Sequence, residues 1–378
     1  MRNLNVGTHI AFNEVSLLPH RYAHQLLRAF SRVVKSTTYL RGVENDTLTC
    51  FFQKQFNTPY VQLLGSGHDA LYFAIKALHL RAGDEVIMQA NSYPTVFPLV
   101  QAGIIRPTLC DVDENGQMSV HELVKRITPR TNAVIVTHLF GLTANIKEIV
   151  KLCKSKGIIL IEDCAQAYGS KFDHKLLGTF GDIGCFSFYP TKNLSTLGDG
   201  GALITKKKKV FEYVQKAAAY GATRQYESEF ISHHSRLPEL QAAALNVYTT
   251  ICNKHFVRRQ KLFVYYVKQI EKNLTGLVKP LASHPNSQPV PHLMVITLTK
   301  RDALKQYLAD KGIITRIHYP KPVHLVPAFS FLHQKRGAYP CAEKLAETQL
   351  SIPFHSFLTH KQIDYVIASI QAFFDIKT

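Results

Sequence analysis

Short apolar runs alternate with helical patterns between about residues 60 and 205. Each run is rich in β-branched or aromatic residues and is bounded by polar residues or glycine, as buried strands are. The runs predict strands at 85–88, 132–139, 157–163 and 182–188. Between them, apolar residues recur three and four positions apart from Leu71 to Leu78 and from Ile146 to Cys153, which predicts amphipathic helices. The alternation predicts an α/β fold with a mostly parallel central sheet flanked by helices.

The pattern changes after about residue 240. One long helical stretch is predicted from Leu240 to Leu274, followed by a segment with several Pro and Ser residues at 279–291 and by a smaller α+β region. We therefore predict a large domain over residues 1–250 and a small C-terminal domain over residues 251–378.

The composition is that of a globular protein, with 46% apolar and 19% charged residues. No apolar run reaches the roughly 18 residues that span a bilayer, so no membrane partner is expected. The first residues lack the apolar core of a signal peptide, so the expected location is the cytoplasm. The seven cysteines form no CxxC pair, which argues against a disulfide framework or a metal site.

The net charge of +18 favours anionic partners such as phosphorylated small molecules, a membrane surface or nucleic acid. The densest basic run, Lys206–Lys209, follows the segment GDGGALIT, whose glycines permit a tight path back into a strand, and a solvated loop is its ordinary explanation. The sequence has no zinc finger and no basic stripe interleaved with aromatic residues, so no nucleic-acid partner is expected.

Candidate chemistry lies where the predicted strands end, because ligands of parallel α/β sheets gather at the carboxyl ends of strands. Asp163 ends one strand, and a carboxylate there either meets a cation or caps the following helix. Lys192 lies in a turn after Pro190, shortly beyond Ser187. A lone loop lysine is usually a solvated surface residue, so Lys192 gains interest only from its neighbours.

The third place is the segment GSGHDAL at 65–71, which opens a predicted helix. Glycines before a helix N-terminus suit phosphate binding through backbone N–H groups, although a plain N-capped glycine turn is the more common explanation of such a segment. A phosphate cradle, a carboxylate and an amine are together the parts of a site for pyridoxal phosphate (PLP).

Three segments resemble a known family: IEDCAQAYGS (161–170), GDIGCFSFYPTKNLSTLGDGGALIT (181–205) and SRLPELQAA (235–243). They are similar to the DegT/DnrJ/EryC1/StrS sugar aminotransferases, which are PLP enzymes of fold type I. The resemblance covers about residues 36–260 and continues more weakly to the end. It implies the large and small domains of that fold, and a homodimer whose active sites are shared between subunits.

The resemblance also implies residue roles. Lys192 is similar to the catalytic lysine that holds PLP as a Schiff base. The other implied cofactor contacts are Asp163 at the pyridine nitrogen, Gln166 at the phenolic oxygen, Tyr93 on the ring face, and Ser187, Gly67 and His68 at the phosphate.

Some positions depart from the family pattern. His68 stands where Thr is usual, and Asp199 stands where Glu is common. His234 replaces an Asn that reaches the phosphate in the neighbouring subunit, although an imidazole can also donate a hydrogen bond. Pro94 follows Tyr93, which bears on the shape of that loop.

The implied reaction takes an amino group from an amino acid, glutamate or glutamine, and passes it through pyridoxamine phosphate to a keto sugar, expected to be nucleotide-linked. Arg316, His318 and Lys321 are basic residues that could hold this acceptor, although ordinary surface charge also explains them. An acceptor of another kind, a cyclitol or other cyclic ketone, stays open. So does a non-catalytic regulatory or binding member of the family.

Overall fold

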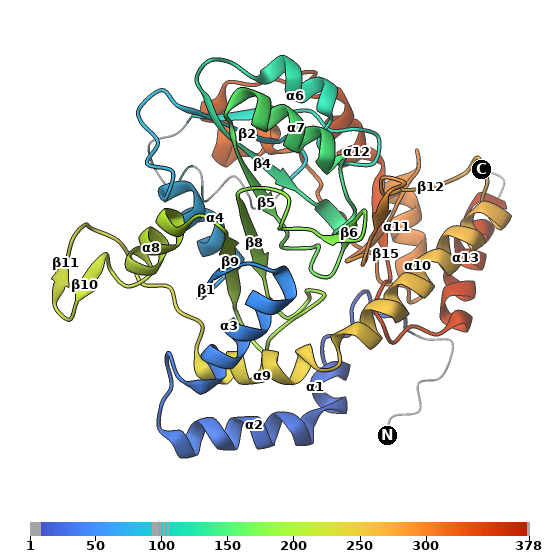
Figure 1. Ribbon diagram of the computed structural model, residues 1–378. Helices are drawn as coiled ribbons and strands as arrows, with labels where there is room; N and C mark the ends of the chain where they lie inside the picture. The colour runs from blue at the N-terminus through green and yellow to red at the C-terminus, as the bar shows by residue number, and fades with distance from the viewer. Residues whose placement is uncertain (1–8, 93–97, 99, 101–102, 104–105, 376–378) are drawn as a thin grey trace.

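A seven-stranded sheet forms the centre of the structure, a computed structural model that describes residues 9–92, 98, 100, 103 and 106–375 (Figure 1). In spatial order its strands are β1 Tyr60–Leu64, β9 Gly201–Thr205, β8 Ile183–Ser187, β5 Ile159–Asp163, β4 Thr131–Thr137, β2 Glu85–Gln89 and β3 Arg106–Cys110. Strand β9 is antiparallel to both of its neighbours, and every other neighbouring pair is parallel. The predicted mostly parallel sheet is therefore confirmed.

Helices cover both faces of this sheet. Successive strand residues point to opposite sides, and because both sets are apolar, both faces need to be covered. In β2, Ile87 packs into the core cluster of one face, whereas Val86 and Met88 pack into that of the other. The first face is covered by α3 Val43–Phe56, α7 Ile146–Lys156 and α9 Glu239–Thr249, and the second by α4 Gly67–Lys76 and α8 Lys208–Ala217.

The predicted long helix is two helices. Helix α9 ends at Thr249, and α10 begins at Cys252 and runs to Asn273 in a different direction (Figure 1). The hydroxyls of Thr249 and Thr250 donate to the carbonyls of Asn246 and Val247 at 2.9 and 2.7 Å. Such local bonds compete with the regular helical pattern and favour a bend, and the apolar periodicity does not record them.

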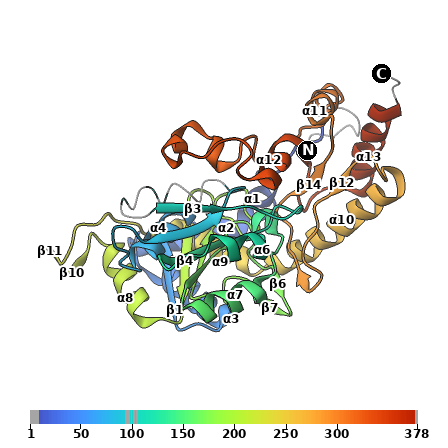
Figure 2. The ribbon, with the colours of Figure 1, turned by 90° about the horizontal axis from the view of Figure 1, so that it is seen from above.

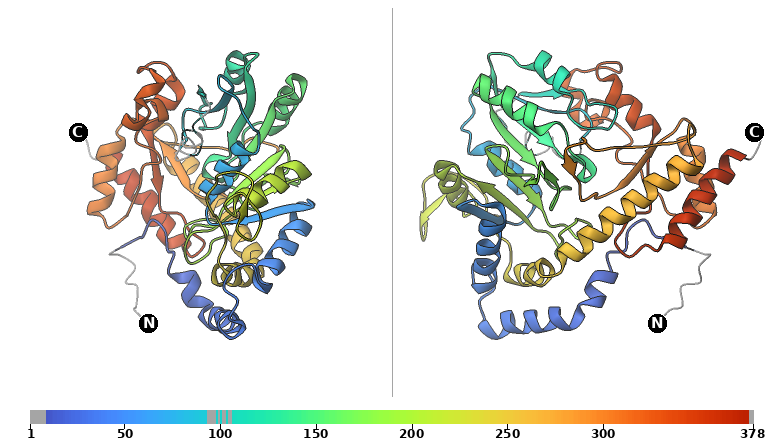
Figure 3. Two further views of the ribbon diagram at one scale, coloured as in Figure 1. Left: turned by 90° about the vertical axis from the view of Figure 1, so that its left-hand side faces the viewer. Right: turned by 45° about the vertical axis from the view of Figure 1, so that its right-hand side comes forward.

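The C-terminal part has its own antiparallel sheet, formed by β12 Lys279–Pro280, β14 Met294–Thr297 and β15 Gln349–Ile352. Its core also contains residues of α10, α11 Arg301–Asp310 and α13 His360–Asp375, and α10 and α13 lie side by side (Figure 3). Ile10 joins this core and exchanges hydrogen bonds with Gly312 and Ile314. The division at residue 250 stays a prediction.

The remaining elements are α1 Leu17–Arg21, α2 Ala23–Ser36, α6 Val120–Arg126, α12 Pro340–Thr348, β6 Lys171–Phe172, β7 Lys175–Leu176, β10 Ala222–Arg224, β11 Glu227–Ser228, β13 Ser287–Gln288, and the 3-10 turns Leu139–Gly141, Val323–Leu325 and Pro327–Leu332. The hairpin β10–β11 projects from the molecule (Figures 1 and 2). Among the described helices, none combines the length and apolar character needed to cross a membrane.

Candidate active site

Asp163 is the last residue of β5, beside the carboxyl end of β8. The residue is buried. Its carboxylate accepts hydrogen bonds from the Ala165 N–H at 3.0 Å and from the Thr137 hydroxyl at 3.3 Å. These two neutral donors do not cancel its charge, and a buried carboxylate is stable only where further donors or a cation face it.

Lys192 lies in a turn that main-chain hydrogen bonds fix on both sides. The Phe188 N–H donates to the Gly200 carbonyl at 2.8 Å, and the Thr196 N–H donates to the Phe188 carbonyl at 2.7 Å. Within the turn, the Lys192 N–H donates to the Tyr189 carbonyl at 2.8 Å. The main chain therefore holds the lysine just beyond the end of β8.

The negative charge of Asp163 acts on the Lys192 amine. Burial lowers the pKa of the Lys192 amine, and the negative charge of Asp163 opposes this shift. A lowered pKa increases the fraction of uncharged amine, which is the nucleophilic form. The structure thus brings together the two residues on which the predicted site most depends.

The N-terminus of α4 lies against the ends of β8 and β9. Ser66 caps the helix, and its hydroxyl accepts the Asp69 N–H at 3.0 Å. A methyl group on Gly67 would lie 2.6 Å from Cβ of Ser187, and one on Gly201 would lie 2.2 Å from the Ser66 carbonyl oxygen. Because only glycine permits these approaches, Gly67 and Ser187 come together at a helix N-terminus that suits an anion.

His68 and His234, the two predicted phosphate contacts that depart from the family pattern, differ in exposure. His68 is half-buried in the first turn of α4. His234 is exposed, and its ring lies 5.0 Å from that of Tyr220. The next residue, Ser235, donates to Asp69 at 2.7 Å and accepts the Gly65 N–H at 2.8 Å, which ties the segment to the start of α4.

Gln166 links the large sheet to the C-terminal part. Its Oε1 accepts the Phe140 N–H at 2.7 Å, and its Nε2 donates to the Tyr319 hydroxyl at 3.3 Å. Tyr319 was not among the predicted site residues. The segment HYPK that contains Tyr319 gave a signal, because His318 and Lys321 of the same segment are predicted to hold the acceptor.

Two histidines of the C-terminal part lie near Lys192. Burial, together with the charges of Lys192 and Arg316, lowers the pKa of His318 to about 4. Burial and Lys192 also lower the pKa of His292 well below its usual value, and Arg259 and His318 add to the effect. Both imidazoles are therefore neutral near pH 7. His292 was not predicted, because nothing in the local sequence PHLM indicates that it faces Lys192.

The three predicted acceptor residues differ in their exposure. The His318 Nδ1 lies 2.8 Å from the Ser351 hydroxyl, and its ring stacks on Phe12. Arg316 and Lys321 are exposed at the surface. Tyr93, the predicted ring-stacking residue, lies outside the described residues.

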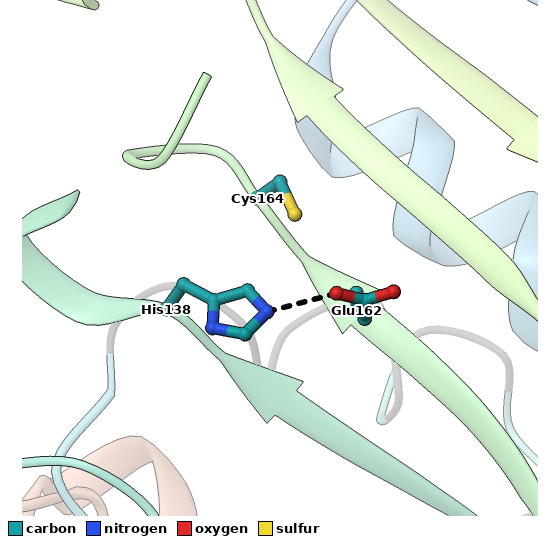
Figure 4. Close-up of side chains that lie close together, drawn as sticks. All are labelled: His138, Glu162 and Cys164. Carbon is teal, nitrogen blue, oxygen red and sulfur yellow. Dashed lines mark hydrogen bonds and ion pairs between the residues drawn. The ribbon is translucent and has the colours of Figure 1, made fainter. Parts of the chain in front are cut away.

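His138, Glu162 and Cys164 form a buried cluster of potential metal ligands (Figure 4). The Glu162 carboxylate lies 3.0 Å from His138 Nε2. It also accepts the N–H groups of Gly178, Phe180 and Gly181 at 2.8, 2.7 and 2.7 Å. Because these donors occupy its oxygen atoms, the cluster is explained as the structural anchor of the 178–181 turn.

Sheet topology and site chemistry place the chain in the class of fold-type I PLP transferases. Residues 21–371 match the DegT/DnrJ/EryC1/StrS aminotransferase family, and the chain belongs to that family, as its sequence predicted.

Solved and named relatives agree with this assignment. The chain is 35% identical to the erythromycin biosynthesis sensory transduction protein EryC1 of Saccharopolyspora erythraea, over 91% of this chain and 94% of the relative. It is 33% identical to a dTDP-3-amino-3,4,6-trideoxy-alpha-D-glucose transaminase of Streptomyces venezuelae, over 94% and 95%. The crystal structure of S. venezuelae DesV in complex with a ketimine intermediate superposes with a TM-score of 0.93 at 31% identity, over 98% of this chain and 100% of that chain.

Proposed function

We propose that this aminotransferase uses Lys192 and Asp163 to move an amino group from glutamate or glutamine to a keto sugar carried on a nucleotide. The observation that carries the proposal is the position of the buried Asp163 carboxylate at the end of β5 and of Lys192 in the turn just after the neighbouring strand β8. Catalytic residues of α/β enzymes are found at this edge of the sheet.

The cofactor is PLP, and the residues present fit it. The buried Asp163 carboxylate suits a protonated ring nitrogen, and the N-terminus of α4, where Gly67 packs against Ser187, suits a phosphate. When bound, PLP accepts the electron pair left at the carbon from which a proton is removed. The same residues would hold its aminated form, pyridoxamine phosphate, which would supply the amino group to the acceptor.

The side chains of this chain supply binding, orientation and proton transfer. Burial lowers the pKa of the Lys192 amine, which prepares it to accept a proton near neutral pH. Asp163 would hold a proton on the ring nitrogen that faces it. The Oε1 of Gln166 is occupied by the Phe140 N–H, so its Nε2 is the group available to the phenolic oxygen as well as to Tyr319.

A nucleotide-linked acceptor is supported by two observations. One relative is named as a transaminase of a dTDP-sugar. The net charge of +18 favours phosphorylated ligands, and the exposed cations Arg316 and Lys321 lie close in sequence to His318, which interacts with Lys192. We propose that these two cations contact the diphosphate.

We further propose that the enzyme is a cytoplasmic homodimer with shared active sites. On the segment with the projecting β10–β11 hairpin, Tyr226 is 96% and Ile231 is 102% exposed. Large apolar side chains gathered at a surface in this way favour a protein contact. His234 is exposed on the same segment, where it can reach a neighbouring subunit. All seven cysteines are free, as expected in a reducing compartment.

A regulatory function is the second candidate, because one relative is named as a sensory transduction protein. The placement of Lys192 and Asp163 favours catalysis, since a purely regulatory protein has no need for a lysine of lowered pKa near a buried carboxylate. A holoenzyme that turns over no amino donor would favour regulation.

The Lys192→Ala variant tests the proposal. We expect it to fold, as judged by circular dichroism, and to lose at least about a hundredfold in amino transfer, because it lacks the proton-transferring amine. Borohydride reduction of the parent protein followed by peptide mapping should place the cofactor on Lys192. Lys209→Ala, which changes an exposed lysine, should behave as the parent. Cofactor on another lysine, or an unchanged rate in Lys192→Ala, would refute the assignment.

A further inference from the structure

A second pocket lies at the end of the strands of the large sheet that is opposite to the candidate active site. It is lined by the beginning of β5, the turn before β8 and the end of β9. Lys192 and Asp163 lie at the other ends of β5 and β8, which are five-residue strands, so about 15 Å of sheet separates the two places. The pocket is therefore distinct from the candidate active site.

The floor of this pocket is apolar. Phe56, Ile158, Leu160 and Ile204 line it, and none of the four is more than 5% exposed. Phe180, which is half-buried, adds an aromatic ring to the wall. A ligand with an apolar or planar group would remove this surface from water.

Four lysines from three separate segments line the same pocket: Lys154 of α7, Lys175 of β7, and Lys206 and Lys207 after β9. Lys207 is paired with Asp182 at 3.1 Å. The other three make no ion pair with any described residue. Their convergence places excess positive charge around an apolar floor.

The surroundings of Lys175 combine an aromatic ring with the like charges of other lysines. Its Nζ lies 4.4 Å from the centre of the Phe180 ring. Burial lowers the pKa of Lys175, and the charges of Lys206 and Lys154 lower it further, against an opposing effect of Glu162. Like charges that interact in this way are stabilised by an anion bound between them.

We propose that this pocket binds a soluble phosphate ester of the nucleotide class. Its phosphate or diphosphate lies among Lys154, Lys175 and Lys206, and its planar group lies on the apolar floor beside Phe180. A lipid surface fits less well, because none of the large apolar residues that are exposed in the described chain lines this pocket. The site does not depend on the proposed reaction.

Competitive acetylation of the holoenzyme tests the proposal at the level of single lysines. Limiting acetic anhydride is added with and without uridine diphosphate or inorganic pyrophosphate, and the modified peptides are quantified by mass spectrometry. We expect both probes to slow acetylation of Lys154, Lys175 and Lys206 several-fold, with uridine diphosphate effective at lower concentration. Lys209, which does not line the pocket, should not be protected. Equal protection of Lys209, or no protection at all, overturns the site.

Two further arms separate the alternatives. In the Lys175→Gln/Lys206→Gln double variant, protection of Lys154 should need about tenfold more pyrophosphate, since two charged contacts are gone. The matched Lys209→Gln variant should match the parent, and both variants should keep the parental amino-transfer rate. Unchanged protection in the double variant contradicts the proposal. Stronger protection by phosphatidylglycerol vesicles than by uridine diphosphate also contradicts it, in favour of a membrane surface.

Discussion

Imidazoles of lowered pKa lie near the candidate active site, where His355 and Lys192 line one pocket, and protonation of these imidazoles opposes folding. Burial and the charge of Arg259 lower the pKa of His355 to about 4. Burial and the charges of Lys192 and Arg316 lower the pKa of His318 to about 4 as well. The Nδ1 atom of His355 has no hydrogen-bond partner among the described residues, which agrees with a neutral ring.

We expect the free energy of unfolding to fall as pH decreases from about 6.5 to about 4. An unfolded histidine takes up its proton near pH 6.5, whereas the folded His355 does so only near the lower value, so the unfolded state binds more protons between them. The stability that the lowered pKa of His355 contributes is fully present above about pH 6.5 and amounts to at most about 3 kcal/mol. Urea denaturation at a series of pH values measures it.

The His355→Gln variant isolates this contribution, because its unfolding free energy should depend less on pH than that of the parent. His20→Gln changes an exposed histidine and serves as the matched control. The same pH dependence in His355→Gln and the parent would show that His355 titrates normally.

Glu162 gives a second prediction at the residue scale. Its buried carboxylate accepts hydrogen bonds from three main-chain N–H groups and faces His138. In Glu162→Gln, an NH2 group replaces one of the two acceptor oxygens and then faces N–H groups that also need an acceptor. We expect a loss of about 2–4 kcal/mol of stability in urea denaturation. Glu148→Gln, at an exposed position of α7, should change stability by less than about 0.5 kcal/mol. A parental midpoint for Glu162→Gln would mean that the anchor is dispensable.

At the scale of elements, the phosphate end of the site depends on how closely three elements approach. Helix α4 begins against the last residue of β8 and the first residue of β9. The atoms nearest to a methyl group on Gly201 are main-chain atoms of Ser66 and Gly67, which cannot rotate away. The helix N-terminus and the strands therefore form one rigid unit.

The Gly201→Ala variant should lose roughly 2 kcal/mol or more of stability, because overpacking displaces the start of α4. PLP affinity should fall with it, as measured by absorbance titration of the apoprotein. Gly198→Ala is the matched control in the same glycine-rich turn, where the nearest atom to an added methyl is the flexible Gln241 amide at 3.0 Å. Equal effects in the two variants would indicate general disturbance of the turn.

At the scale of the whole molecule, the exposed segment at 220–234 carries the dimer proposal. Mixing Lys192→Ala and His234→Ala subunits should restore activity if His234 acts in the partner's site. One intact site then forms in each mixed dimer, and random exchange of subunits gives roughly a quarter of the parental rate. The measurement is the amino-transfer rate before and after subunit exchange, with each variant alone as the control. No recovery would place His234 in the site of its own subunit.

Much of the fold could be predicted because most strands of the large sheet are marked by residues that are neighbours in the sequence. The buried runs around Ile87, Val134 and Ile161 are continuous and β-branched, and the structure contains them close to their predicted bounds. Strands β1 and β3 were not predicted. They are the two edges of the sheet, and Pro107 in β3 is a residue that usually argues against a strand.

The sequence by itself determined the alternation of the inner strands with helices, the family, and the turn that carries Lys192, because these depend on residues that are neighbours in the chain. Only the tertiary structure decided that His292 and Tyr319 lie beside the site, and that Lys154, Lys175 and Lys206 line one pocket. The physical reason is that such side chains come from distant segments. Their distances are set by the packing of the sheet and its helices, which no local pattern records.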